Sequence, residues 1–150
     1  MDNDDVISTL NDLIETCKDG EYGFRSCAEH VDSRELATLF SQRADECRQA
    51  AVELQEHVLQ LGGKPDTGGS LSGAVHRGWV AVRSALSVYD NLSVLKECER
   101  GEDIAVTSYR DALEQPLPEP VRSVVERQYL GAKRNHDQVR VLRDSLEVVK

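Results

Sequence analysis

The segment LGGKPDTGGSLSGAVHRGWVAVRSALSVYD (residues 61–90) decides the fold, because it separates two long helical patterns. A Gly-Gly pair followed by Pro65 is typical of a helix C-terminus. Ser70 then fits the N-cap of a short helix over 71–87, which is long enough to run back along a bundle. A tight turn would make the flanking helices antiparallel neighbours. We therefore expect a long crossover between two parallel helices.

Apolar residues recur in steps of three and four along four long stretches outside this segment, which is the spacing of one helix face. Asp32-Ser33 ends the first stretch and caps the second, and prolines at 116–120 break the chain before the last. No strand-like alternation of useful length occurs. We expect helices over about 4–31, 34–61, 71–87, 90–114 and 119–148. One long crossover makes this an all-α, ferritin-like four-helix bundle with a short extra helix in the crossover.

Trp79 is the large apolar side chain of the expected crossover helix. We expect its ring to anchor this helix against the bundle.

The composition fits one soluble domain over residues 1–150. Aromatic residues make up only 5% and charged residues 30%, which favours helices packed through aliphatic side chains. The formal net charge is −9, so a nucleic-acid or membrane-surface partner is disfavoured. The start of the chain, MDNDDVISTL, is acidic and does not resemble a secretory signal. We expect a cytoplasmic protein.

The four cysteines contain no C-x-x-C pair, which argues against a zinc site and against a disulfide framework. Cys17, Cys47 and Cys98 fall on apolar helical stripes. We expect these three to be buried thiols that act as small hydrophobes.

Carboxylates on the apolar stripes are the unusual feature, because an unpaired buried charge is costly. Glu21, Glu99 and Glu102 are such residues. Counting from the turns places them at one height in the bundle. The residues expected to share this mid-bundle layer are Glu21, Arg43 or Glu46, Glu99, Glu102, Lys133 and His136.

Three interpretations of this layer are open, and they differ in function. A di-iron carboxylate bundle needs one Glu from each of two helices and a Glu-x-x-His from each of the other two, and the paired motifs are missing here. The candidate metal ligands are Glu21, Glu46, Glu99, Glu102 and His136. Iron or manganese would suit them, although we expect no cofactor in the native protein. The alternatives are an ion-pair network, in which Arg43 and Lys133 neutralise the carboxylates, and a different helix phase that exposes them.

Four stretches of the chain resemble a bacterial family of uncharacterised four-helix-bundle proteins, a domain of unknown function placed in the ferritin-like superfamily. These stretches are DGEYGFRSCAEHV (19–31), LGGKPDTGGSLSGAVHRGW (61–79), CERGEDIAVTSY (98–109) and NHDQVRVLRD (135–144). The resemblance implies the same fold and no activity. The metal chemistry of the wider superfamily would carry over only onto Glu21, Glu102 and His136.

We therefore weigh two functions. The first is a ferritin-like bundle that lacks a complete di-iron site and acts as a non-catalytic interaction or stress-associated protein. The alternative is a metal-binding or redox protein with an atypical carboxylate–histidine site in the bundle core. Of these two functions we favour the first, so an enzymatic activity is the less favoured expectation. We expect a homodimer, because two-fold dimers are the commonest closed assemblies.

Overall fold

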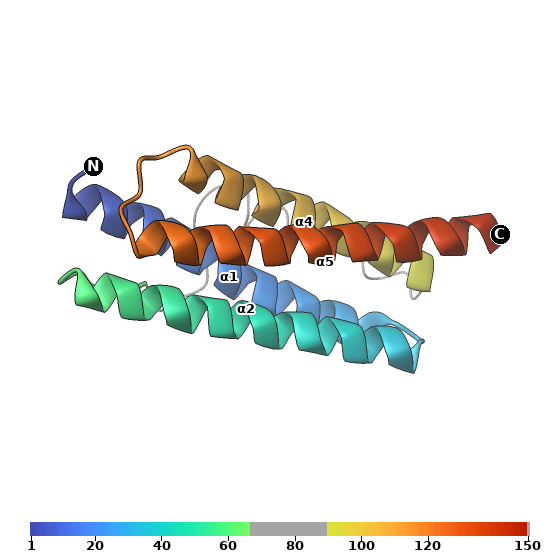
Figure 1. Cartoon of the computed structure of the whole chain (residues 1–150). Helices are drawn as coiled ribbons and strands as arrows, with labels where there is room; N and C mark the ends of the chain where they lie inside the picture. Colours follow the sequence, from blue (N-terminus) through green and yellow to red (C-terminus); the bar gives the residue numbers. More distant parts are fainter. Residues whose placement is uncertain (67–89, 150) are drawn as a thin grey trace.

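The computed structural model describes residues 1–66 and 90–149. Within them the chain forms α1 (Asn3–His30), α2 (Arg34–Gln60), α4 (Asn91–Leu113) and α5 (Val121–Val149), and no strand. The four helices lie side by side along one long axis (Figure 1). The all-α four-helix bundle is confirmed, and each of these helices begins and ends within two residues of the expected bounds.

Side chains cap the N-termini of three of these helices. The carboxylate of Asp2, the hydroxyl of Ser33 and the carboxylate of Asp90 accept hydrogen bonds from Asp5 N, Leu36 N and Leu92 N, respectively. Each bond satisfies a backbone donor that has no partner within the helix. The expected cap at Ser33 is therefore confirmed.

The Gly-Gly pair ends α2 as the sequence predicts. Gly63 N donates to Val58 O and Gly62 N donates to Leu59 O, each at 3.0 Å. These are the two bonds of a Schellman motif. Gly62 has φ +82°, which a residue without a Cβ adopts at little cost. The turn that starts the long connection is thus fixed locally.

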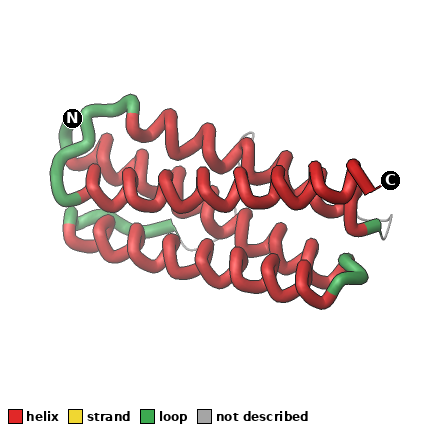
Figure 2. The backbone as a smooth tube through the Cα atoms, turned by 45° about the vertical axis from the view of Figure 1, so that its right-hand side comes forward, coloured by secondary structure: helices red, strands yellow, loops and turns green. Residues whose placement is uncertain are grey.

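The helices α2 and α4 run parallel, as the connector predicts. Asn91, at the start of α4, accepts hydrogen bonds through Oδ1 from the backbone N–H groups of Asp32 and Ser33, at the start of α2. Both helices then run toward the same end of the bundle, opposite in direction to α1 and α5 (Figure 1). Figure 2 shows the short loops at the bundle ends. The most extensive packing is of α1 on α2 and of α4 on α5, whereas α2 and α5 touch little.

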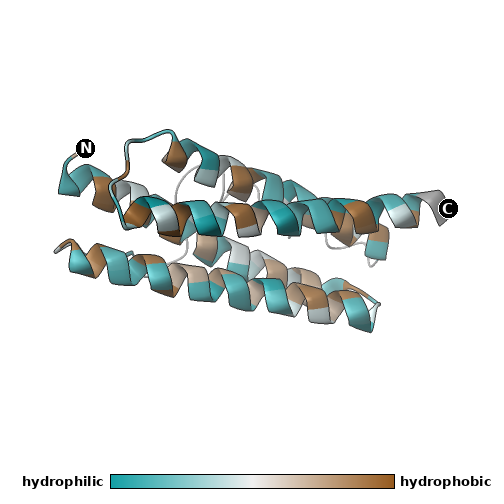
Figure 3. Ribbon diagram, in the orientation of Figure 1, coloured by the Kyte–Doolittle hydropathy of each residue, from teal (hydrophilic) through white to brown (hydrophobic). Residues whose placement is uncertain are grey.

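The core forms two clusters of buried side chains, one toward each end of the bundle. The first cluster includes Leu10, Leu54 and Val125, and the second is centred on Phe24 and Phe40, whose rings stack at 6.3 Å. Each of the four described helices carries both hydrophobic and hydrophilic stretches (Figure 3). The middle of the bundle, between the two clusters, is where polar side chains come inward.

The cysteines are free thiols. Cys17 and Cys98 are buried as predicted, Cys27 is buried as well, and Cys47 is half-buried. Burial raises the pKa of the Cys17 thiol to about 11. The buried thiols therefore pack as small apolar groups.

The expected helix over 71–87 and its anchor Trp79 lie outside the described residues. Within residues 1–66 and 90–149, no helix is both long and apolar enough to span a lipid bilayer.

Candidate functional site

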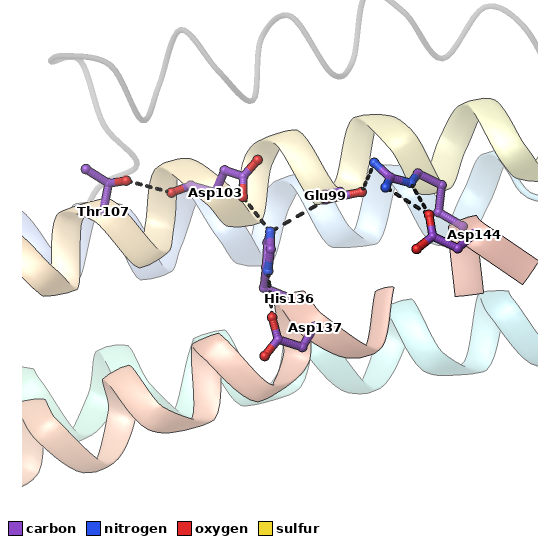
Figure 4. A network of polar contacts seen from close by, with 7 residues as sticks. Glu99, Asp103, Thr107, His136, Asp137 and Asp144 are labelled. Atoms are coloured by element: carbon purple, nitrogen blue, oxygen red, sulfur yellow. Dashed lines mark hydrogen bonds and ion pairs between the residues drawn. The ribbon is translucent and has the colours of Figure 1, made fainter. Parts of the chain in front are cut away.

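Three side chains with metal-ligating atoms converge on the seam between α4 and α5. Glu99 and Asp103 stand one turn apart on α4, and His136 faces them from α5 (Figure 4). One ligand atom from each lies within 4.8 Å of the others. Across the part of the chain that the structure describes, this is the sole group of three or more His, Cys, Asp or Glu side chains that close together. We call it the seam cluster.

The contacts within the seam cluster centre on the Nε2 atom of His136. This atom lies 3.9 Å from Glu99 Oε1 and also contacts Asp103 Oδ1. The other ring nitrogen, Nδ1, lies 3.2 Å from Asp137 Oδ1. A carboxylate on Nδ1 orients the ring and leaves Nε2 to face the cluster.

The solvent exposure of the side chains differs across the seam cluster. Glu99 is 8% exposed, whereas the Asp103 side chain is 61% exposed. The second oxygen of Glu99 pairs with Arg143 Nη1 at 2.7 Å. A cation can therefore reach the cluster from solvent, while Arg143 holds the inner carboxylate in place and offsets part of its charge.

The chemistry of this set is that of a divalent cation site. Two carboxylates and a neutral imidazole supply two negative charges and mixed oxygen and nitrogen donors, which suit first-row transition ions. Three protein ligands leave coordination positions for water. The set alone contains no nucleophile–base pair of the kind used in covalent catalysis.

A cavity of about 590 Å³ opens in the same mid-bundle layer, on the side where α2 and α5 touch little. All four described helices contribute to its walls, and it includes Arg43, Cys47 and Glu102. We call it the bundle cavity. It is separate from the seam cluster, because none of the three cluster residues lines it.

Glu102 is the most perturbed carboxyl group at the bundle cavity. Burial raises the pKa of Glu102 to about 8, with smaller increases from Asp103, Glu99 and Glu46, while Arg43 opposes the shift. No ion pair or hydrogen bond to Glu102 is made within residues 1–66 and 90–149, and its Oε1 is buried without a partner. The protonated form of Glu102 is therefore favoured at neutral pH.

A chain of hydrogen bonds crosses one end of the bundle cavity. Tyr109 Oη donates to Gln128 Oε1 at 2.8 Å, and Gln128 Nε2 donates to Glu53 Oε1 at 2.8 Å. Because the phenol has one proton, the Cys17 thiol is the donor in its 3.1 Å contact with Tyr109 Oη. Burial, together with this thiol, raises the pKa of Tyr109. These hydrogen bonds link all four described helices and fix their register at this height.

The structure separates the residues that the sequence places in one layer. It brings Glu99 and His136 together in the seam cluster. Glu102 lines the bundle cavity instead, as does Glu46, which pairs with Arg43 at 3.2 Å and accepts from Asn135. Glu21 pairs with Arg25 at 3.2 Å. The metal-ligand role of each of these residues stays a prediction.

The ion pairs in this layer differ from the predicted network, in which Arg43 and Lys133 neutralise Glu21, Glu99 and Glu102. Arg43 is buried near Glu102, but its ion pair is with Glu46, and Glu21 pairs with Arg25 instead. Lys133 is exposed, and Arg143 takes the place expected for it beside Glu99. Counting residues from a turn gives the height of a side chain along the axis, but it does not give how far a long arginine reaches.

A di-iron centre does not fit these residues. It would need two further Glu-x-x-His pairs, and the carboxylates at this height on α1 and α2 are already paired with arginines. The buried cation of Arg43 also stands beside Glu102, where two metal ions would repel it. The seam cluster offers ligands for one ion.

Sequence reasoning missed two residues of the seam cluster and its surroundings, Asp103 and Arg143. The spacing of both residues in the sequence could have indicated them. Asp103 follows Glu99 by four residues and Arg143 follows His136 by seven, so each lies on the same helix face as its neighbour. Asp103 falls just outside the apolar stripe of its helix, which is why a search restricted to the stripe passes over it.

The family described as "Domain of unknown function (DUF2383)" matches residues 5–115, which span α1, α2 and α4. No curated protein matches the chain.

Proposed function

The chain belongs to the DUF2383 family, a domain of unknown function, and we propose a function from the geometry of its site. We propose that the protein binds one divalent transition-metal ion at the seam cluster. The observation that carries this proposal is the approach of ligand atoms from Glu99, Asp103 and His136 to within 4.8 Å of one another. The site draws its ligands from two helices, so a bound ion would also clamp α4 to α5.

The ligand types support a transition ion over magnesium. Magnesium prefers an octahedral shell of oxygen atoms and keeps several waters, whereas iron(II), manganese(II) and zinc(II) accept imidazole together with carboxylates. The contact of Asp137 with the far side of the His136 ring matches the outer carboxylate that commonly orients a metal-binding histidine. The residues of this chain would hold the ion and keep Arg143 on the second oxygen of Glu99.

The role that we propose is binding without catalysis, as an interaction or stress-associated protein. We also propose that the fold is ferritin-like, with the centre reduced from two ions to one. The parallel course of α2 and α4 across a long connection supports this relation. A homodimer and a cytoplasmic location remain part of the proposal.

The metal content of the native protein tests this function. We expect Mn²⁺ and Zn²⁺ each to bind to metal-free protein with a stoichiometry of one ion per chain, measured by equilibrium dialysis at pH 7. Mg²⁺ in large excess should compete weakly, because the imidazole ligand disfavours it. Two ions per chain, or equal competition by Mg²⁺, would contradict a mononuclear transition-metal site.

A further inference from the structure

The bundle cavity is large enough for a small organic ligand, and the chain keeps it open with small side chains. Its volume of about 590 Å³ lies in the range of pockets that hold drug-sized molecules. Glycine or alanine lines it from every described helix: Gly20, Ala50, Ala105, Gly131 and Ala132. Larger residues at these positions would close the space, because the interiors of helical bundles are otherwise tightly packed.

Two buried polar atoms in residues that line the bundle cavity have no hydrogen-bond partner. Arg43 is 7% exposed and uses Nη1 for Glu46 and Nη2 for Gln138, which leaves its Nε–H group unpaired. Glu102 is 5% exposed, and its Oε1 is unpaired. Leaving a buried donor or acceptor without a partner is unfavourable, so a group that satisfies both atoms would bind with a gain.

Most of the charged side chains around the bundle cavity are already paired with one another. Three arginines and three glutamates contribute to its lining: Arg43, Arg127, Arg134, Glu46, Glu53 and Glu102. Several of them already pair across the opening, with Arg43 on Glu46 and Arg127 on Glu53. A charged ligand would therefore compete with these ion pairs for its counter-charge and would lose its own hydration on entry.

We propose that the bundle cavity binds a neutral small molecule that carries a carboxamide or lactam group on an apolar body. Once the Arg43 and Glu102 side chains turn toward the cavity, such a group offers a carbonyl oxygen to the Nε–H of Arg43 and an N–H to Oε1 of Glu102, so each unpaired atom gains a partner. The apolar body packs against Phe24, Cys17 and the alanines of the wall. Uncharged ligands also have the smallest desolvation cost in a half-enclosed site.

Three probe molecules of similar shape, one neutral and two charged, test whether the cavity prefers the neutral amide. The probes are 3-phenylpropanamide, 3-phenylpropanoate and 3-phenylpropylamine, titrated into ¹⁵N-labelled full-length protein with amide NMR shifts as the readout. The amide should bind with a dissociation constant about tenfold lower than that of the acid or the amine, the effect of one good hydrogen bond. Equal affinities for the three would mean that only the phenyl ring is recognised and would overturn the proposal.

A cavity-filling variant places the binding in the bundle cavity. Ala132→Leu should weaken binding of the amide at least tenfold, because its side chain occupies part of the space. Ala37→Leu, at a half-buried position on α2 that does not line the cavity, is the matched control and should bind as the native protein does. Unchanged binding in the Ala132→Leu variant would overturn the proposal.

Arg43→Met removes the donor and keeps the length of the side chain. It should reduce the preference for the amide over the amine to within about twofold, since the lost hydrogen bond is the source of that preference. If this variant does not fold, Glu102→Met offers the same test through the acceptor. A tenfold preference for the amide that survives the substitution would overturn the assignment of these two atoms.

Discussion

Replacement of Glu102 by glutamine should raise the free energy of unfolding at pH 9 by an amount on the order of a few kcal/mol. Glu102 is buried, and its carboxyl pKa is raised from 4.5 to about 8, chiefly by burial. When the pKa of a group differs by 1 between the folded and unfolded states, the ionised form differs in stability by about 1.4 kcal/mol. Glutamine has nearly the same shape and never ionises.

The sign follows from the proton balance. Between pH 4.5 and about 8 the folded protein binds a proton at Glu102 that the unfolded chain has released. Stability therefore falls as pH rises through this window. Below pH 4.5 the carboxyl is protonated in both states, so the native protein and the Glu102→Gln variant should unfold with similar free energies there.

Urea denaturation in steps from pH 4 to 9, with a chelator present to keep metal away, measures this difference. Glu21→Gln is the matched control, because Glu21 is a partly exposed carboxylate paired with Arg25. The control should follow the native pH profile. If the advantage of Glu102→Gln were the same at pH 4 and pH 9, its origin could not be the ionisation of Glu102.

Loss of the imidazole at the seam cluster is the second large effect that we expect. His136→Gln should lower the affinity for Zn²⁺ by about a hundredfold or more, or about 2.7 kcal/mol. The reason is geometric: His136 is the one ligand that α5 contributes, so without it both remaining ligands come from α4. Isothermal titration calorimetry at fixed pH gives the affinity.

The control for this substitution is His57→Gln, in the last turn of α2. Its Zn²⁺ affinity should equal that of the native protein. Far-UV circular dichroism of both variants should match the native spectrum, since His136 lies on the bundle seam and is not one of the apolar residues that form the two buried clusters. Equal loss of affinity in the two variants would point to unspecific histidine binding.

The fold follows from the sequence to a large extent, because its signals are local. Ser33 and the Gly62-Gly63 pair end or start helices through their own backbone and side-chain bonds. The length of the connection then leaves one direction for α4. The bond from Asn91 to the start of α2 agrees with that direction.

The candidate site can be predicted from the sequence only in part. Residue counts give the position of a side chain along the bundle axis, but they do not give the direction in which it points around the helix. Residue counts correctly place Glu99 level with His136. They cannot tell that Glu102, three residues later and turned about 60° around the helix, faces the bundle cavity instead. Nor can an apolar stripe reveal that α2 and α5 stay apart, since the space between them depends on small residues from all four described helices.

The histidine ring resonances of the native protein during a Zn²⁺ titration test the central claim most directly. The chain has four histidines, so their signals can be assigned by substitution. We predict that the ring signals of His136 shift in proportion to added Zn²⁺ and stop at one equivalent, while those of His30 and His57 stay in place. Ring signals of His136 that are unmoved at one equivalent, or that move together with those of His30 and His57, would contradict a metal site at Glu99, Asp103 and His136.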